Sequence, residues 1–120
     1  MQEGEINMGY RSDIFICCEE DCKELIEAIL EAEPDFHETD DGKFRAAFEG
    51  WKWYESYSHV DKIMSAMAKI EERECEGYMG RTYMDLPYGY MQIGEEYDDV
   101  VEHGRPYDYG INMVRHLEWI

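Results

Sequence analysis

An acidic segment in the last third of the chain is the part of the sequence best suited to bind a charged ligand. Between residues 95 and 102 it carries five acids with no Lys or Arg among them: Glu95, Glu96, Asp98, Asp99 and Glu102. Like charges that lie close together lower stability unless something offsets them, so such a segment is a candidate for a binding surface. The alternative is a solvated loop that only maintains solubility.

Carboxylates at this spacing could coordinate a divalent metal ion or bind to a basic surface of another protein. Acid pairs such as Glu95 with Asp99 could bind Mg²⁺ or Ca²⁺, but the run lacks the alternating oxygen ligands and central glycine of a calcium loop. The four histidines are scattered, without a ligand spacing such as i, i+4: His37, His59, His103 and His116. We therefore predict no metal site and no cofactor.

The cysteines offer little support for catalysis or zinc binding. Cys17 and Cys18 are adjacent and point to opposite faces if they lie on a strand, so they cannot both ligate one zinc ion without breaking that strand. No signature of a cysteine nucleophile surrounds Cys17, Cys18 or Cys75, and no glycine-rich loop with a Lys opens a helix. We predict that the protein is not an enzyme and that its thiols, including Cys22, are reduced.

The charge of the whole chain restricts its partners. Its 120 residues include 29 acids against 11 Lys and Arg, which gives a formal charge of −18. This charge opposes any approach to nucleic-acid phosphates and argues against direct binding of DNA or RNA. A basic protein partner is the natural inference, and basic proteins commonly bind nucleic acid themselves.

Length and composition suit one globular domain outside a membrane. With 44% hydrophobic residues, the chain can bury a single core over residues 9–120. Residues 1–8 have no periodicity and are expected to form a flexible tail. No run of about 18 apolar residues predicts a membrane span, and the first residues lack the features of a signal peptide, so we expect a cytoplasmic protein.

The first half of the chain predicts a strand, a helix and a bulged strand. Residues 10–18 are apolar on both faces, as in an inner strand, and residues 20–33 have the apolar spacing of a helix. A turn over residues 40–42 leads into a strand over 43–54, in which Gly50 predicts a bulge, with two short strands as the alternative. The helix presents a second acidic face: Glu24, Glu27 and Glu31.

The second half predicts a helix over residues 59–74 and a strand over 88–93. The acidic segment is expected to be a loop or short helical turn, and residues 111–119 alternate as a terminal strand, with a helix over 113–117 as the alternative. Together these elements predict an α+β domain with a mainly antiparallel sheet of about four strands, covered on one face by two helices.

Three short motifs resemble those of a loose group of small phage-encoded proteins. They are Gly9-Tyr-Arg-Ser-Asp-Ile, Trp53-Tyr-Glu-Ser-Tyr and Tyr90-Met-Gln-Ile-Gly-Glu-Glu-Tyr-Asp-Asp. The resemblance implies a phage origin. By analogy of class, it also implies a host-directed role like that of the acidic anti-CRISPR and anti-restriction proteins, which resemble DNA in charge.

These inferences lead to the hypothesis of a non-enzymatic inhibitor that occupies a basic nucleic-acid-binding surface on a host defence complex. Its acidic segment and its helical acids would form one continuous patch. Replacing Glu95, Glu96, Asp98 and Asp99 by Ser should then abolish binding and leave stability equal or higher. The alternatives are a small phage enzyme or a nucleotide- or metal-binding module, with a pocket lined by Tyr, Trp and His, and an accessory domain with neither property.

Overall fold

The main sheet is built around strand β2 (Ser12–Glu19). The structure is a computed structural model, and it describes residues 10–75, 86–96, 99–113 and 117–119. The order of the five antiparallel strands is β3-β4-β2-β5-β6, which places β2 at the centre. Its residues are mostly buried on both faces, so the predicted inner strand is confirmed. The expected tail over residues 1–8 lies outside the described residues.

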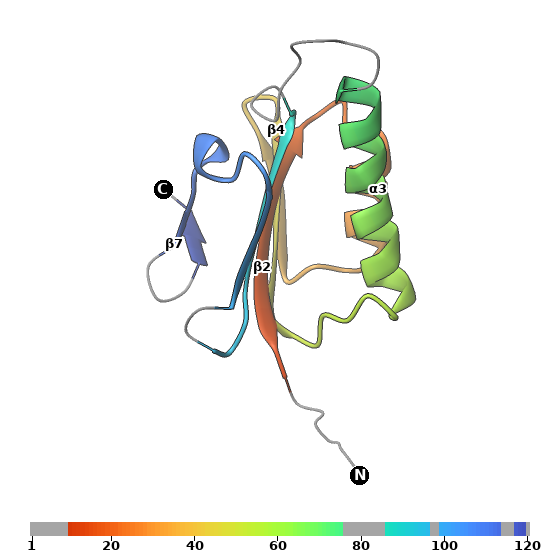
Figure 1. Cartoon of the computed structure of the whole chain (residues 1–120). Helices are drawn as coiled ribbons and strands as arrows, with labels where there is room; N and C mark the ends of the chain where they lie inside the picture. Colours follow the sequence, from red (N-terminus) through yellow and green to blue (C-terminus); the bar gives the residue numbers. More distant parts are fainter. Residues whose placement is uncertain (1–9, 76–85, 97–98, 114–116, 120) are drawn as a thin grey trace.

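Helices α2 (Lys23–Glu31) and α3 (Ser58–Cys75) cover one face of this sheet (Figure 1). Each helix turns an apolar stripe toward the strands, and Leu25 and Ile63 are completely buried there. Burial of a large aliphatic side chain stabilises a fold by roughly 1.5–3 kcal/mol, so this layer is the main source of stability. The predicted α+β class with two helices on one face is confirmed.

Both helices begin and end within a few residues of their predicted bounds. Helix α3 extends one residue further at each end than the predicted range 59–74. Helix α2 is shorter than the predicted range 20–33, because Cys22 is the N-cap and Glu33 has a left-handed φ of 60°. A left-handed residue beyond the C-cap ends a helix, and the proline that follows cannot continue it.

The sheet has five strands rather than about four, and one addition is β3 (Phe36–Asp40). A two-residue turn, with Asp41 at φ 56° and Gly42 at φ 78°, joins β3 to β4 (Lys43–Trp51). Positive φ at both central positions is the mark of a type I′ hairpin. The predicted turn is therefore confirmed, but the strand that precedes it was missed because all of its residues are exposed and show no apolar alternation.

A bulge interrupts β4 at Gly50. The register passes from Ser12 opposite Trp51 to Ile14 opposite Phe48, which leaves one extra residue on β4. Gly50 has φ 69°, a conformation that a side chain would strain. The prediction of one bulged strand is confirmed, although the strand ends at Trp51 and does not reach residue 54.

Strand β5 (Tyr88–Ile93) has its predicted bounds and pairs with β6 (Val100–Gly104). The expectation of a loop or short helical turn over residues 95–102 is wrong for its C-terminal half, because Glu102 lies within β6 opposite Met91. This short strand was missed in the sequence because an acid and a histidine follow its two valines and leave no apolar alternation.

The C-terminal region forms a second, two-stranded sheet on the face opposite the helices (Figure 1). It consists of β7 (Ile111–Met113) and β8 (Leu117–Trp119), preceded by a 3₁₀ helix, η2 (Tyr107–Tyr109). Ile111 joins a small core with Phe15 and Met91 of the main sheet. The predicted single terminal strand is therefore wrong, and both faces of the main sheet are at least partly covered.

Candidate functional site

Two acids of the predicted segment accept hydrogen bonds from the two residues that precede β2. The Tyr10 hydroxyl donates a hydrogen bond to the Asp99 carboxylate, and the backbone N–H of Arg11 donates one to the Glu95 carboxylate at 2.6 Å. The loop closes on itself through a bond of 2.8 Å from the Gly94 N–H to the Asp99 carbonyl. These contacts join the N-terminal end of the described chain to the β5–β6 loop.

The surroundings of the Tyr10 hydroxyl leave it little freedom. The hydrogen bond to Asp99, with a smaller contribution from burial, raises the pKa of Tyr10. A Cβ on Gly94 would clash with both the Tyr10 hydroxyl and the Asp99 carboxylate, so a side chain there would displace this hydrogen-bonded pair. The expectation that replacing these acids leaves stability equal or higher does not fit these contacts.

The other acids of the segment are placed differently from one another. Glu96 is exposed in the loop, and Asp98 lies outside the described residues. Glu102 is exposed on β6 and accepts a long hydrogen bond of 3.4 Å from the Tyr107 hydroxyl. Glu96 and Glu102 are therefore the two acids of the segment that the structure describes as exposed and whose side chains form at most one long hydrogen bond.

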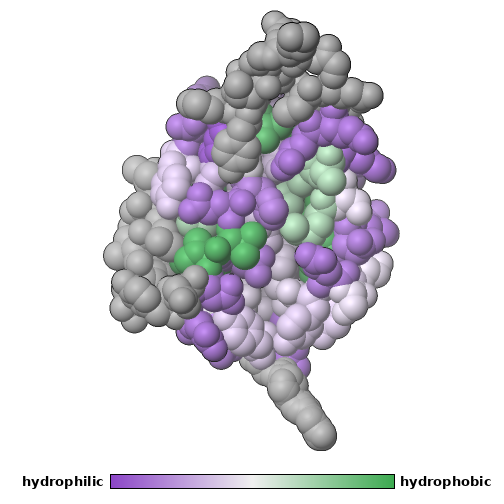
Figure 2. All heavy atoms as spheres, in the orientation of Figure 1, coloured by the Kyte–Doolittle hydropathy of each residue, from purple (hydrophilic) through white to green (hydrophobic). Residues whose placement is uncertain are grey.

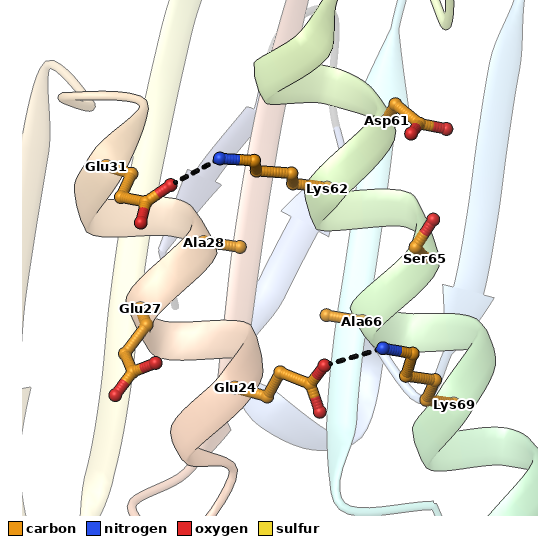
Figure 3. Close-up of a pocket in the computed structure, with 9 residues that line it drawn as sticks. All are labelled: Glu24, Glu27, Ala28, Glu31, Asp61, Lys62, Ser65, Ala66 and Lys69. Atoms are coloured by element: carbon orange, nitrogen blue, oxygen red, sulfur yellow. Dashed lines mark hydrogen bonds and ion pairs between the residues drawn. The ribbon is translucent and has the colours of Figure 1, made fainter.

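The acidic face of α2 turns toward α3 and is largely compensated. Glu24 pairs with Lys69 at 2.9 Å and Glu31 pairs with Lys62 at 3.0 Å, across a shallow cavity of about 260 Å³ that Glu27 also lines (Figure 3). Exposed ion pairs of this kind contribute roughly 0–1 kcal/mol each. Two of the three predicted contact acids on this helix are therefore already neutralised by lysines.

The predicted patch is divided by the sheet. Glu102 stands opposite Met91, and directly opposed residues of an antiparallel pair share a face. Met91 belongs to the small core beneath the C-terminal hairpin, whereas α2 lies on the other face. Glu102 and the α2 acids consequently do not form one continuous surface, contrary to the expectation from the sequence.

A different group of acids is both exposed and clustered. Residues 19–41 contain eleven acids and a single Lys. Six of these acids are exposed and have no hydrogen bond or ion pair through their side chains within the described residues. One is Glu33, beyond the end of α2, and we call the other five the α2–β3 acids: Glu20, Asp21, Glu27, Asp40 and Asp41. A hydrogen bond of 3.0 Å from the Glu20 N–H to the Gly42 carbonyl brings the start of α2 beside the β3–β4 turn.

Only Glu27 of this group was among the predicted contacts. The density of acids over residues 19–41 was a usable signal, but the missed strand β3 hid the fact that the turn and the helix lie together. Figure 2 shows one face of the molecule, where hydrophilic side chains predominate and hydrophobic ones form only small patches.

A second cavity gathers aromatic and basic side chains. It has a volume of about 420 Å³, and its lining includes Arg11, Trp51, Lys52, Tyr57 and His59. The ring centroid of His59 lies 5.8 Å from that of Trp51 and 5.7 Å from that of Tyr57. Within the described residues neither Arg11 nor Lys52 forms an ion pair.

Cys17, Cys18 and Cys22 are buried, and the surroundings of the first two disfavour the thiolate, whereas the hydrogen bond with Cys18 lowers the pKa of Cys22. Burial raises the pKa of Cys17 to about 11, and a hydrogen bond to Cys22, together with burial, raises that of Cys18. The thiolate is the nucleophile, so these shifts disfavour reaction. Among the residues that the structure describes, no group of three or more His, Cys, Asp or Glu side chains could hold a metal ion.

Comparison of the chain with protein-family models, with curated proteins and with solved structures gave no match. In the described part of the chain, none of the helices is both long enough and apolar enough to span a membrane.

Proposed function

We propose that this protein is a non-enzymatic, phage-encoded inhibitor of a host nucleic-acid-dependent defence system, comparable in class to the anti-CRISPR proteins. It binds a basic nucleic-acid-binding surface of a host protein and competes there with nucleic acid. The formal charge of −18 supports this role, because it steers the chain toward basic surfaces and away from nucleic acid itself.

The observation that carries the proposal is the clustering of the α2–β3 acids. Their carboxylates are exposed and are not engaged by lysines or arginines of the described chain. Unpaired carboxylates on a surface can replace the phosphates that a basic groove otherwise contacts. Glu96 and Glu102 extend acidic charge to the other end of the sheet, where they aid steering more than contact.

The test is capture of the partner from host lysate, followed by competition with duplex DNA. We expect a captured nucleic-acid-binding protein that DNA displaces, with affinity that falls steeply as salt rises, because exposed charges are screened beyond about 10 Å at 0.1 M salt. Binding that persists unchanged at about 1 M salt, or that DNA does not affect, would contradict the proposal.

A nucleotide-binding module is the second candidate, and the aromatic and basic cavity favours it. Trp51 and Tyr57 could stack on a base while Arg11 and Lys52 contact a phosphate. Nucleoside monophosphates should then raise the unfolding temperature, and Arg11→Ala should remove that shift. No shift with any of the common nucleotides would exclude this candidate.

A further inference from the structure

Strand β3 leaves one edge of the main sheet free. Within the described residues it pairs with β4 alone, and each of its five residues is exposed. In a two-residue hairpin the residues that flank the turn, Asp40 and Lys43, form a hydrogen-bonded pair, and every second pair after it does the same. The backbone N–H and C=O groups of His37 and Thr39 therefore point away from β4, toward the free edge.

A groove lies beside this edge, between β3 and α2. Its volume is about 440 Å³, and apolar atoms of Ile26, Leu30 and Phe44 line it together with the side chains of His37 and Thr39. Leu30 is 41% exposed, which is high for a leucine on a helix that otherwise packs against the sheet. Sites of strand addition combine these two features, since backbone pairing supplies affinity and a pocket accepts alternate side chains.

The charges around the edge define what could dock there. Two acids, Glu20 and Glu27, and one cation, Lys23, lie at the groove, on the helix-covered face of the sheet. On the opposite face of β3, Glu38 and Asp40 are exposed. One carboxylate oxygen of Glu38 forms an ion pair with the Arg45 guanidinium at 3.4 Å. Lys43 and Arg45 stand opposite these two acids on β4, but the edge strand itself carries acids and no Lys or Arg, so a docking segment with basic residues is favoured.

We propose that β3 pairs with an extended segment of a partner protein in which apolar and basic residues alternate. The apolar side chains face the groove, and the basic side chains lie on the other face against Glu38 and Asp40. The inference rests on the proposed function only in requiring a basic partner. It adds the backbone conformation of the bound segment and the period of its side chains.

The alternation follows from the geometry of paired strands. Side chains of directly opposed residues share a face, so a residue opposite His37 or Thr39 points to the groove and a residue opposite Glu38 points away from it. Opposite charges across a strand pair stabilise it. A lysine opposite Glu38 also places its aliphatic stem near Phe36, which is 39% exposed on that face.

The probe for this inference is a capped heptapeptide that alternates lysine and valine, beginning and ending with lysine. In such a peptide the amides of all valines face one edge and the amides of all lysines face the other. We would compare two N-methylated forms of it, one methylated on every valine amide and one on every lysine amide. A scrambled peptide of the same composition controls for charge.

We expect the unmodified peptide to bind, and one of the two N-methylated peptides to lose at least about tenfold in affinity while the other retains it, because only one set of amides faces β3. Which of the two is lost reports whether the added strand is antiparallel or parallel. Two N-methylated peptides that behave alike, or a scrambled peptide that binds as well as the alternating one, would overturn the proposal.

Amide hydrogen exchange and one pair of variants locate the binding. The amides of His37 and Thr39 should exchange at least about tenfold more slowly with peptide bound, because they become hydrogen-bonded. Thr39→Pro removes an outward N–H that β4 does not use, so the variant should fold and lose at least about tenfold in peptide affinity, while Thr39→Ala should bind like the unaltered protein. A folded Thr39→Pro protein that binds the peptide normally would overturn the proposal.

The fate of this inference can be separated from that of the proposed function. If Thr39→Pro fails to fold, the N-methylated peptides decide the question on the unaltered chain. If DNA displaces a captured basic partner but the alternating peptide does not bind, the proposed function stands and strand addition at β3 is wrong. If the peptide binds and no captured partner is displaced by DNA, strand addition stands and the proposed function is wrong.

Discussion

The two ends of the main sheet carry similar charge and use it differently. At the β5–β6 end, the Glu95 and Asp99 carboxylates accept hydrogen bonds from the two residues that precede β2. At the β3 end, Asp40 and Asp41 have no side-chain partner within the described residues, and they adjoin a free strand edge. The first pair of acids stabilises the fold, and the second is available to a partner.

This difference shows that acid density alone does not locate a binding surface. A carboxylate that accepts a hydrogen bond from its own chain has lost part of its capacity to attract a cation, and removing it leaves a donor unpaired. A carboxylate without such a partner only adds repulsion, which a basic ligand relieves. The predictions below test this division, from the largest expected effect on stability to the smallest.

Gly89→Ala should show how tightly the β5–β6 side is built. A Cβ at this position would lie 2.6 Å from Pro106 Cα and 2.8 Å from the Arg105 carbonyl carbon, and backbone atoms cannot move aside as side chains do. Overpacking of this kind lowers the free energy of unfolding by about 3 kcal/mol. Urea denaturation measures it, and Thr39→Ala on the β3 edge is the control, with an expected change within about 0.5 kcal/mol. Equal effects at both positions would show that Gly89 is not tightly enclosed by the backbone of Arg105 and Pro106.

Asp99→Asn should lower the free energy of unfolding by about 1 kcal/mol, since it weakens the charged hydrogen bond with Tyr10 and disturbs the loop. Asp40→Asn is its matched control at the other end and should leave stability unchanged or slightly higher. A double-mutant cycle of Asp99→Asn with Tyr10→Phe should give non-additive effects, because the two residues are hydrogen-bonded. Additive effects would show that the contact contributes nothing.

Stability should fall at high pH through the buried tyrosines. Burial and a hydrogen bond of 2.9 Å to Glu19 raise the pKa of Tyr109, and burial raises that of Tyr90. A group whose pKa is raised in the folded state contributes stability that is complete below the ordinary tyrosine value of about 10 and is lost as pH rises above it. Unfolding free energy measured against pH should therefore stay level up to about pH 9 and then decline. In Tyr109→Phe, the free energy of unfolding should decline less at high pH. A curve identical to that of the unaltered protein would show that Tyr109 does not contribute to the decline.

Neutralising acids at the β3 end should have the smallest effect. The triple variant Glu27→Gln, Asp40→Asn and Asp41→Asn should keep its stability or gain a few tenths of a kcal/mol, because self-repulsion falls and Asn tolerates the left-handed turn position. Glu31→Gln should instead lose up to about 0.5 kcal/mol, since it breaks the pair with Lys62. A marked loss in the triple variant would assign these acids a structural role.

Elements with a strong apolar period could be predicted from the sequence. The run of apolar residues on both faces of β2 indicated a central strand, and the spacing in α2 and α3 indicated two helices on one face. The bulge at Gly50 was predicted correctly, because a glycine inside a strand pattern often marks a bulge. The exposed β3 and the charged β6 were missed, since neither strand buries an alternating face.

The candidate site was predicted less well, for a physical reason. Sequence shows how many acids a segment contains, but not which carboxylates meet a donor far away in the chain. The partners of Glu95 and Asp99 are separated from them by more than eighty positions, and Lys62 and Lys69 reach α2 from another helix. Composition indicates only that a partner would be basic, and tertiary structure was needed to show which carboxylates are engaged by their own chain.

The most direct test of the account compares two variants of equal charge. One removes three acids around β3, Glu38→Gln, Asp40→Asn and Asp41→Asn, and the other removes three exposed acids elsewhere, Glu55→Gln, Glu96→Gln and Glu102→Gln. The affinity of the alternating lysine–valine peptide is then measured for both at low salt. We expect about a tenfold loss for the first variant, from roughly 0.2–1 kcal/mol per lost pair, and at most about a twofold loss for the second. Equal losses would show that the peptide responds only to net charge, and the claim that the β3 end is the binding surface would be wrong.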